Sequence, residues 1–472
     1  MWFPIATVCA LACAGVAWRC ERRGPLLLAL YAWVCSLLLA SPILFTYSVR
    51  YSLEADVFIG VCLTVTTALY LIVRRLPRDP PSQYTGALEL RAASVMGVLG
   101  IAGCLLLLAD ARASGLQFSV TYLLDNLNQI RDSQFEALAE SSDRGAIGTV
   151  GGLAAPCGLL CILAAVRLGR NAGRTLLTLA VVNALLIAVI SLGVLAGRAT
   201  ITNVVLLSIV SLYLSGRRLF VLGARRTLIA VVAVIGAWYL STSWVATRED
   251  DTAADYILEE TQRAQVRPWL KSVTGGNESS SLALVTIGYF ASPIPTLHYY
   301  LADRDLPGPF YGAYSFPLPA RLVGTVDGTW TRTEWYSLRQ EVFTPIASRG
   351  YFDNVWSTWL RDLLVDFGHL GAILFCALFG SFMAWARNRS DLTGALHYHY
   401  LEVIACFTMG FGAFTSFLFN AFMFIPFVAA LIIMCVVRAS VTARTQPLPA
   451  PAATGDGATP QPAGAVGGRT GV

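Results

Sequence analysis

A long polar segment ends and an apolar run begins within the stretch SRGYFDNVWSTWLRDLLVDFGHLG, residues 348–371. Charged or amide side chains gather here just before the apolar residues: Arg349, Asp353, Asn354, Arg361, Asp362 and Asp366. A charge at the edge of a membrane is costly unless it is paired or used in function. We therefore expect residues 348–371 to form part of a functional site at the membrane boundary.

The composition of the rest of the chain predicts a membrane protein. The 472 residues are 56% hydrophobic and 13% charged, whereas soluble proteins carry about 25% charged residues. The mean hydropathy is +0.60. The expected fold class is an all-α polytopic membrane protein. Basic residues do not cluster with interleaved aromatic residues, although the net charge is +5, so the sequence does not favour nucleic-acid binding.

Apolar runs long enough to cross a bilayer, about 20 residues each, predict about eleven helices in a range of about ten to twelve. The last two runs are nearly continuous and divide only near Asn420. The expected spans are 2–18, 25–47, 55–73, 92–109, 146–166, 175–196, 199–216, 227–245, 363–385, 400–418 and 421–437.

The distribution of arginine predicts the orientation and the division of the chain. Alternate short loops are rich in arginine, and such loops face the cytoplasm. This places the N-terminus outside and the C-terminus in the cytoplasm. The expected parts are an N-terminal bundle of about eight helices (1–247), a long extracytoplasmic loop with short helices (248–361), C-terminal membrane helices (362–438) and a disordered cytoplasmic tail (439–472).

Three smaller segments carry further predictions. Residues 110–145 resemble an amphipathic helix lying along the outer membrane surface. Residues 281–301 are apolar, but Pro293 and Pro295 favour a surface or re-entrant helix over a straight span. His397 and His399 fall in a cytoplasmic loop and are expected to be solvated.

No His/Cys cluster is present in the sequence, so we expect no metal site.

Arginines on the outer side suit a phosphate ligand, because a guanidinium offers a planar fork and keeps its charge. Arg198 begins a tight hairpin between two spans, and Arg339, Arg349 and Arg361 come from the long loop. The alternative for Arg198 is contact with lipid headgroups. For the loop arginines the alternative is a surface ion pair.

Carboxylates near the end of the loop could orient or deprotonate a sugar hydroxyl. Asp353 and Asp366 are the candidates, whereas Asp362 also fits the first turn of a helix, where an acid complements the dipole. His298 is a weaker candidate for a base. Trp356 belongs to a set of outer aromatic residues that either stack on sugars or form the interfacial belt. The motif Asp303-Arg-Asp305 could hold a metal but fits a surface turn better.

The sequence lacks the motifs of several enzyme classes. It contains no phosphate-binding P-loop and no Gly-x-Ser-x-Gly nucleophile motif. The predicted spans contain few charges, which argues against an ion-coupled transporter or pump.

The whole layout resembles the bacterial O-antigen and capsule repeat-unit polymerases of the Wzy type. The long outer loop, the paired helices after Gly197-Arg198, the amphipathic segment near Arg131 and the stretch Tyr289-Phe-Ala-Ser-Pro293 support this resemblance. The matching letters at the loop's return are Gly350, Asn354, Thr358, Asp366, Gly368, Gly371 and Gly380. The outward N-terminus and eleven rather than about twelve helices depart from the family pattern.

The resemblance implies a glycosyltransferase of the bacterial cytoplasmic membrane that acts outside the cytoplasm. Its donor would be an oligosaccharide on polyprenyl pyrophosphate, and its acceptor a second lipid-linked repeat unit. No cofactor or metal would be required. Membrane lipid, a flippase and a chain-length regulator of the same pathway would be its partners. The resemblance implies catalytic roles for Arg198, Asp366 and Asp353, and substrate binding by Arg198, Arg339, Arg349, Arg361, Asn354, Arg131, His298 and Trp356.

Two alternatives stay open at this point. The first is another lipid-sugar transferase: an O-antigen ligase, which relies on a loop histidine that only His298 could match, or a transferase using polyprenyl-phosphate sugars. The second is a glycolipid transporter or flippase. It needs polar residues inside the bundle, and Asn183, Asn203 and Asn420 are few for that purpose.

Overall fold

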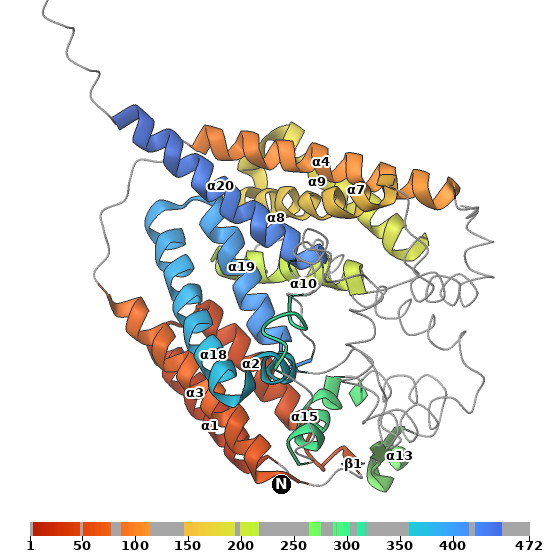
Figure 1. The fold of residues 1–472 in the computed structure, drawn as a ribbon, viewed down its shortest axis with the longest axis vertical. Helices are drawn as coiled ribbons and strands as arrows, with labels where there is room; N and C mark the ends of the chain where they lie inside the picture. The colour runs from red at the N-terminus through yellow and green to blue at the C-terminus, as the bar shows by residue number, and fades with distance from the viewer. Residues whose placement is uncertain are drawn as a thin grey trace, which may run out of the picture.

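The computed structural model describes residues 3–47, 51–76, 86–113, 146–193, 199–216, 264–274, 287–288, 290–302, 309–316, 319, 358–414 and 421–445. These residues form a bundle of helices with one short sheet (Figure 1). In chain order the helices are α1 (Pro4–Cys20), α2 (Pro25–Leu39), α3 (Leu53–Arg75), α4 (Gly86–Ala113), α7 (Ala146–Ala154), α8 (Gly158–Leu168), α9 (Gly173–Gly193), α10 (Ala199–Leu214), α13 (Pro268–Thr274), α15 (Pro293–Ala302), α18 (Trp359–Thr393), α19 (Leu396–Phe411) and α20 (Ala421–Thr445). Two short 3-10 helices, Ala155–Cys157 and Gly169–Ala172, flank α8.

Six of the described helical segments are long and apolar enough to cross a membrane. They are Leu53–Arg75, Gly86–Ala113, Ile147–Leu168, Gly173–Ser191, Trp359–Thr393 and Phe422–Ser440. Three shorter apolar helices accompany them: Pro4–Cys20, Pro25–Leu39 and Thr200–Leu214. The structure thus agrees with a helical membrane-embedded protein. The count of about eleven spans stays a prediction, and the expected spans 2–18 and 227–245 lie partly and wholly outside the described residues.

The span predicted over 25–47 is wrong at its end. Helix α2 stops at Leu39, and Pro42 cannot continue a helix because it lacks the backbone N–H. Strand β1 (Phe45–Tyr47) follows and pairs antiparallel with β2 (Ala264–Val266), with Phe45 opposite Val266. The sheet therefore ties the α2–α3 connection to the segment predicted as the outer loop.

The helices form two groups that share α19 (Figure 1). One core is built by α1, α2, α3, α15 and α18, and the other by α4, α8, α9, α10 and α20. Helix α19 contributes Ala405 and Met409 to the first core and Leu401 and Phe407 to the second. Because α19 is buried on both sides, it is the central element between the groups.

Helices α3 and α18 form the most extensive helix pair. They approach so closely that a Cβ added to Gly380 would lie 2.4 Å from the carbonyl oxygen of Thr66. The Thr66 hydroxyl also donates to the carbonyl of Cys376 over 3.3 Å. A glycine is therefore needed at position 380 for this contact.

Helix α18 is longer than predicted and is kinked. It begins at Trp359, before position 363, because the Thr358 side chain caps it by accepting from the backbone N–H of Arg361. Gly368, with φ 65° and ψ −176°, interrupts the helix, a conformation that only glycine adopts easily. Helix α20 also continues to Thr445, past the start of the predicted tail at 439.

Candidate functional site

Asp366 holds a separate chain segment against the first part of α18. Its fully buried carboxylate accepts hydrogen bonds from the backbone N–H of Tyr314 at 3.0 Å and of Ser315 at 2.6 Å. The backbone carbonyls of Val365 and Asp366, next to the kink, accept from the N–H groups of Phe310 and Tyr311 at 3.4 and 3.0 Å. We call residues 309–316 the clamped segment.

Arg361 supports the same segment from inside the protein. Its side chain is 1% exposed, and its Nε and Nη2 donate to Oδ1 of Asp362 at 3.0 and 2.8 Å. Nη2 also donates to the Tyr314 hydroxyl at 3.1 Å, and the guanidinium lies 5.3 Å from the centre of the Tyr300 ring. A buried cation needs such a carboxylate and aromatic contacts. Arg361 is therefore engaged within the protein as a positioning residue.

The clamped segment contains a strained turn. Tyr311 and Gly312 have φ values of 52° and 95°, and the N–H of Ala313 donates to the carbonyl of Phe310 at 3.0 Å. Positive φ at both central residues is typical of a type I′ turn, which favours Asn, Asp and Gly. Tyr311 is the only non-glycine residue with positive φ among the described residues. A side chain in this conformation costs about 1 kcal/mol.

His298 lies buried beside the start of α3. Its Nδ1 accepts from the backbone N–H of Ser52 at 3.2 Å, so the proton of the neutral ring is on Nε2. Within the described part of the chain, Nε2 has no hydrogen-bond partner. Burial lowers the pKa of His298 to about 4. The ring packs 4.6 Å from Phe3 and 5.6 Å from Tyr51, so His298 stays neutral and offers a donor rather than a base at Nε2.

Asp56 completes this end of the bundle by capping α1. Its carboxylate accepts from the backbone N–H groups of Ile5 at 3.0 Å and Ala6 at 2.9 Å, and from the Tyr51 hydroxyl at 2.9 Å. A carboxylate at a helix N-terminus complements the helix dipole. Asp56, His298 and Asp366 thus fix the first turns of α1, α3 and α18, and we call this the Asp366 end of the bundle.

The structure brings together three of the residues predicted from the sequence. Arg361 and Asp366 meet through the clamped segment, and His298 belongs to α15, which also carries Tyr300 beside Arg361. The predicted residues that lie outside the described ranges are Arg131, Arg198, Arg339, Arg349, Asp353, Asn354 and Trp356. Their convergence stays a prediction.

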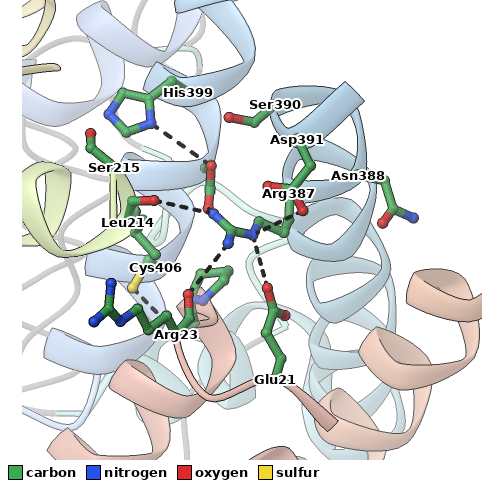
Figure 2. A network of polar contacts seen from close by, with 12 residues as sticks. Glu21, Arg23, Leu214, Ser215, Arg387, Asn388, Ser390, Asp391, His399 and Cys406 are labelled. Atoms are coloured by element: carbon green, nitrogen blue, oxygen red, sulfur yellow. Dashed lines mark hydrogen bonds and ion pairs between the residues drawn. The ribbon is translucent and has the colours of Figure 1, made fainter. Parts of the chain in front are cut away.

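A second polar cluster, centred on Arg387, occupies the opposite end of α18 (Figure 2). The Arg387 Nε donates to Glu21 at 2.9 Å and its Nη1 to the fully buried Glu402 at 2.8 Å. Arg74 from α3 donates to Glu21 at 3.3 Å and also pairs with Asp391. The residue after α1 and the helices α3, α18 and α19 are therefore joined by one network, which we call the Arg387 cluster.

The prediction that His397 and His399 are solvated is wrong, because α19 begins at Leu396 and buries both side chains. His399 contacts the Ser211 hydroxyl of α10 at 2.8 Å through Nε2. His397 pairs with Glu89 of α4, whose other oxygen accepts from the N–H of Leu396 at 3.0 Å.

The described helices also bury more charge than the sequence indicates. Asp56, Glu89 and Glu402 have exposures of 5% or less. All three lie within about two turns of a helix start, where backbone N–H groups or arginines offset the burial. The short spacing of Arg387 and Asp391 on one helix face was the only local signal for the Arg387 cluster.

Among the residues that the structure describes, no group of three or more His, Cys, Asp or Glu side chains is arranged to hold a metal ion. Comparison with known proteins adds no relative: no family model, no curated protein and no solved structure matches this chain.

Proposed function

We propose that this membrane-embedded protein is a polymerase that joins oligosaccharide repeat units carried on polyprenyl pyrophosphate. In this proposal it lies in the bacterial cytoplasmic membrane and acts at the extracytoplasmic face. The observation that carries the proposal is the buried unit of Arg361, Asp362 and Asp366. It fixes the first turns of α18 at the point where the long segment 248–361 reaches an apolar helix.

The chemistry of the proposal is a transfer between two lipid-linked glycans. A hydroxyl of the acceptor attacks the anomeric carbon of the donor, the bond from that carbon to the pyrophosphate oxygen breaks, and polyprenyl pyrophosphate leaves. The hydroxyl proton passes to a carboxylate. Preorganised cations stabilise the negative charge that develops on the leaving phosphate, and Arg198, Arg339 and Arg349 are the candidates for this role.

The described contacts bear on one of the two candidate carboxylates, Asp366. Both oxygens of Asp366 accept backbone N–H groups and the side chain is fully buried, so this residue orients the clamped segment. We therefore assign proton acceptance to Asp353 and positioning to Asp366. In the same way we assign to Arg361 the positioning of the clamped segment. Asn354 and Trp356 remain candidates for contact with sugar.

The geometry of His298 argues against the ligase alternative. A ligase that uses a histidine base needs an accessible nitrogen lone pair. His298 uses Nδ1 to accept from Ser52 and carries its proton on the buried Nε2. For this reason we prefer the polymerase to the ligase.

The proposal is tested by the surface glycan of a strain that lacks this gene. The expected result is single repeat units in place of long chains on a gel, with restoration by the wild-type gene. An Arg198→Ala variant at normal protein level should fail to restore long chains. Long chains in the deletion strain would overturn the proposal. Transport of labelled glycolipid by the protein in liposomes, with no polymer formed, would favour a transporter.

A further inference from the structure

We infer that Tyr311 is a sugar-stacking residue whose ring receives the flat face of a pyranose of the glycan substrate. The inference rests on the proposed function and adds a binding residue to it. It starts from a contradiction: the fold places a large aromatic side chain where the backbone favours a small or amide residue.

The turn itself does not explain the tyrosine. Tyr311 occupies the first central position of the type I′ turn, where a Cβ is unfavourable and Asn, Asp or Gly is preferred. Its side chain is 83% exposed, so burial does not compensate for the strain. The fold would therefore be at least as stable with asparagine at this position.

The backbone of Tyr311 is nevertheless held firmly. Its N–H donates to the Asp366 carbonyl at 3.0 Å, and the carboxylate of Asp366 binds Tyr314 and Ser315 a few residues further on. A Cβ at Gly312 would lie 3.3 Å from the ring of Phe367, so the turn sits directly against α18. The exposed ring of Tyr311 therefore extends from a backbone that is fixed against α18, close to the buried unit of Arg361, Asp362 and Asp366.

This arrangement suits a ligand that binds by stacking. An exposed ring with a fixed backbone loses little conformational freedom on binding, which favours affinity. The face of a pyranose presents C–H groups to an aromatic ring, and the phenol hydroxyl adds a hydrogen bond at the edge.

The competing role for an exposed tyrosine near the end of an apolar helix is that of a membrane anchor. Leu370 of α18, 81% exposed just after the kink, already presents an apolar side chain for such anchoring. Anchoring also requires no particular backbone conformation, whereas Tyr311 is held in a strained one. These two observations favour the sugar ligand.

The test uses the full-length protein in the deletion strain, complemented with Tyr311→Asn, Tyr311→Phe or Tyr311→Trp. Asparagine suits the turn but removes the ring, and we expect the modal glycan chain length to fall at least two-fold. Phenylalanine and tryptophan keep the ring and should keep at least most of the chain length. The matched control is Leu370→Ala, which removes a similarly exposed apolar side chain at the same end and should leave chain length unchanged.

Wild-type chain length with Tyr311→Asn would overturn the stacking role while leaving the polymerase proposal intact. Equal loss of membrane-inserted protein in Tyr311→Asn and Leu370→Ala would identify an anchor and also overturn it. Long chains in the deletion strain itself would instead overturn the polymerase proposal on which the inference rests. Shortened chains with Tyr311→Asn, at normal protein level and with an unchanged thermal midpoint, would support it.

Discussion

Single buried carboxylates and one histidine decide how the Asp366 end is held together. Asp366, Asp56 and His298 each accept hydrogen bonds from backbone N–H groups of another segment. A buried N–H that loses its acceptor costs about 1–3 kcal/mol. Even substitutions that change few atoms at these residues should therefore lower the free energy of unfolding.

Asp366→Asn should destabilise the protein by about 1–3 kcal/mol. The amide keeps one acceptor oxygen but turns an NH₂ donor toward one of the two N–H groups, of Tyr314 or Ser315. Thermal unfolding in detergent micelles measures the effect. The control is Glu54→Gln, whose half-exposed pair with His369 should change stability by less than about 1 kcal/mol. Equal midpoints for the two variants would contradict the clamp.

His298 should make stability depend on pH between about 6.5 and about 4. The folded pKa is about 4 because of burial, so the unfolded state, with a pKa of about 6.5, binds more protons in this window. Stability should fall as the pH falls, by up to about 1.4 kcal/mol per pH unit. Thermal midpoints across this window are the measurement.

His298→Asn supplies the comparison for this pH dependence. The asparagine oxygen can still accept from Ser52, but it does not titrate, so the slope should become flatter. An unchanged slope in His298→Asn would show that another group titrates.

At the scale of elements, the close packing of α3 against α18 connects the Asp366 end with the Arg387 cluster. Gly380→Ala should destabilise the protein by about 1–3 kcal/mol, because its Cβ would lie 2.4 Å from the Thr66 carbonyl oxygen. Gly15→Ala in α1 has no atom within 4 Å of the added Cβ. It should be neutral or stabilising by up to about 1 kcal/mol. Unfolding of the two purified variants in parallel distinguishes them, and a neutral Gly380→Ala would contradict the close packing.

Sequence patterns predicted helices better than they predicted helix ends and partners. The apolar run of α18 is visible in the sequence, but its start at Trp359 depends on the Thr358 cap. The burial of His397 and His399 depends on Glu89 and Ser211, which are distant in the chain. Arg361 and Asp366 were found because charges at a membrane edge are unusual. Their partners Tyr300 and Tyr314 were not assigned to them, since no local pattern indicates a contact with the clamped segment.

At the scale of the whole molecule, the Arg387 cluster and α19 join the two helix groups, because Arg387 of α18 also donates to the Leu214 carbonyl of α10 at 3.4 Å. Arg387→Met should cost about 3–5 kcal/mol, because it leaves the buried Glu402 and the nearby Glu21 without their shared cation. Limited proteolysis and denaturant unfolding should then reveal separate transitions for the two groups. Arg19→Met, at an exposed position in the last turn of α1, should change stability by less than about 0.5 kcal/mol. A single unaltered transition in Arg387→Met would show that α19 alone couples the groups.

The kink at Gly368 also makes α18 a spacer of defined length. From Gly368 to Arg387 the helix rises about 28 Å at about 1.5 Å per residue, close to the roughly 30 Å thickness of a bilayer's hydrocarbon layer. The Asp366 end and the Arg387 cluster are thus separated along α18 by about the thickness of this layer. Longer acyl chains would make the hydrocarbon layer thicker than this separation. Either the charges of the Asp366 end or those of the Arg387 cluster would then be drawn toward hydrocarbon. We expect thermal stability in reconstituted bilayers to peak at intermediate acyl length and to decline as the chains lengthen.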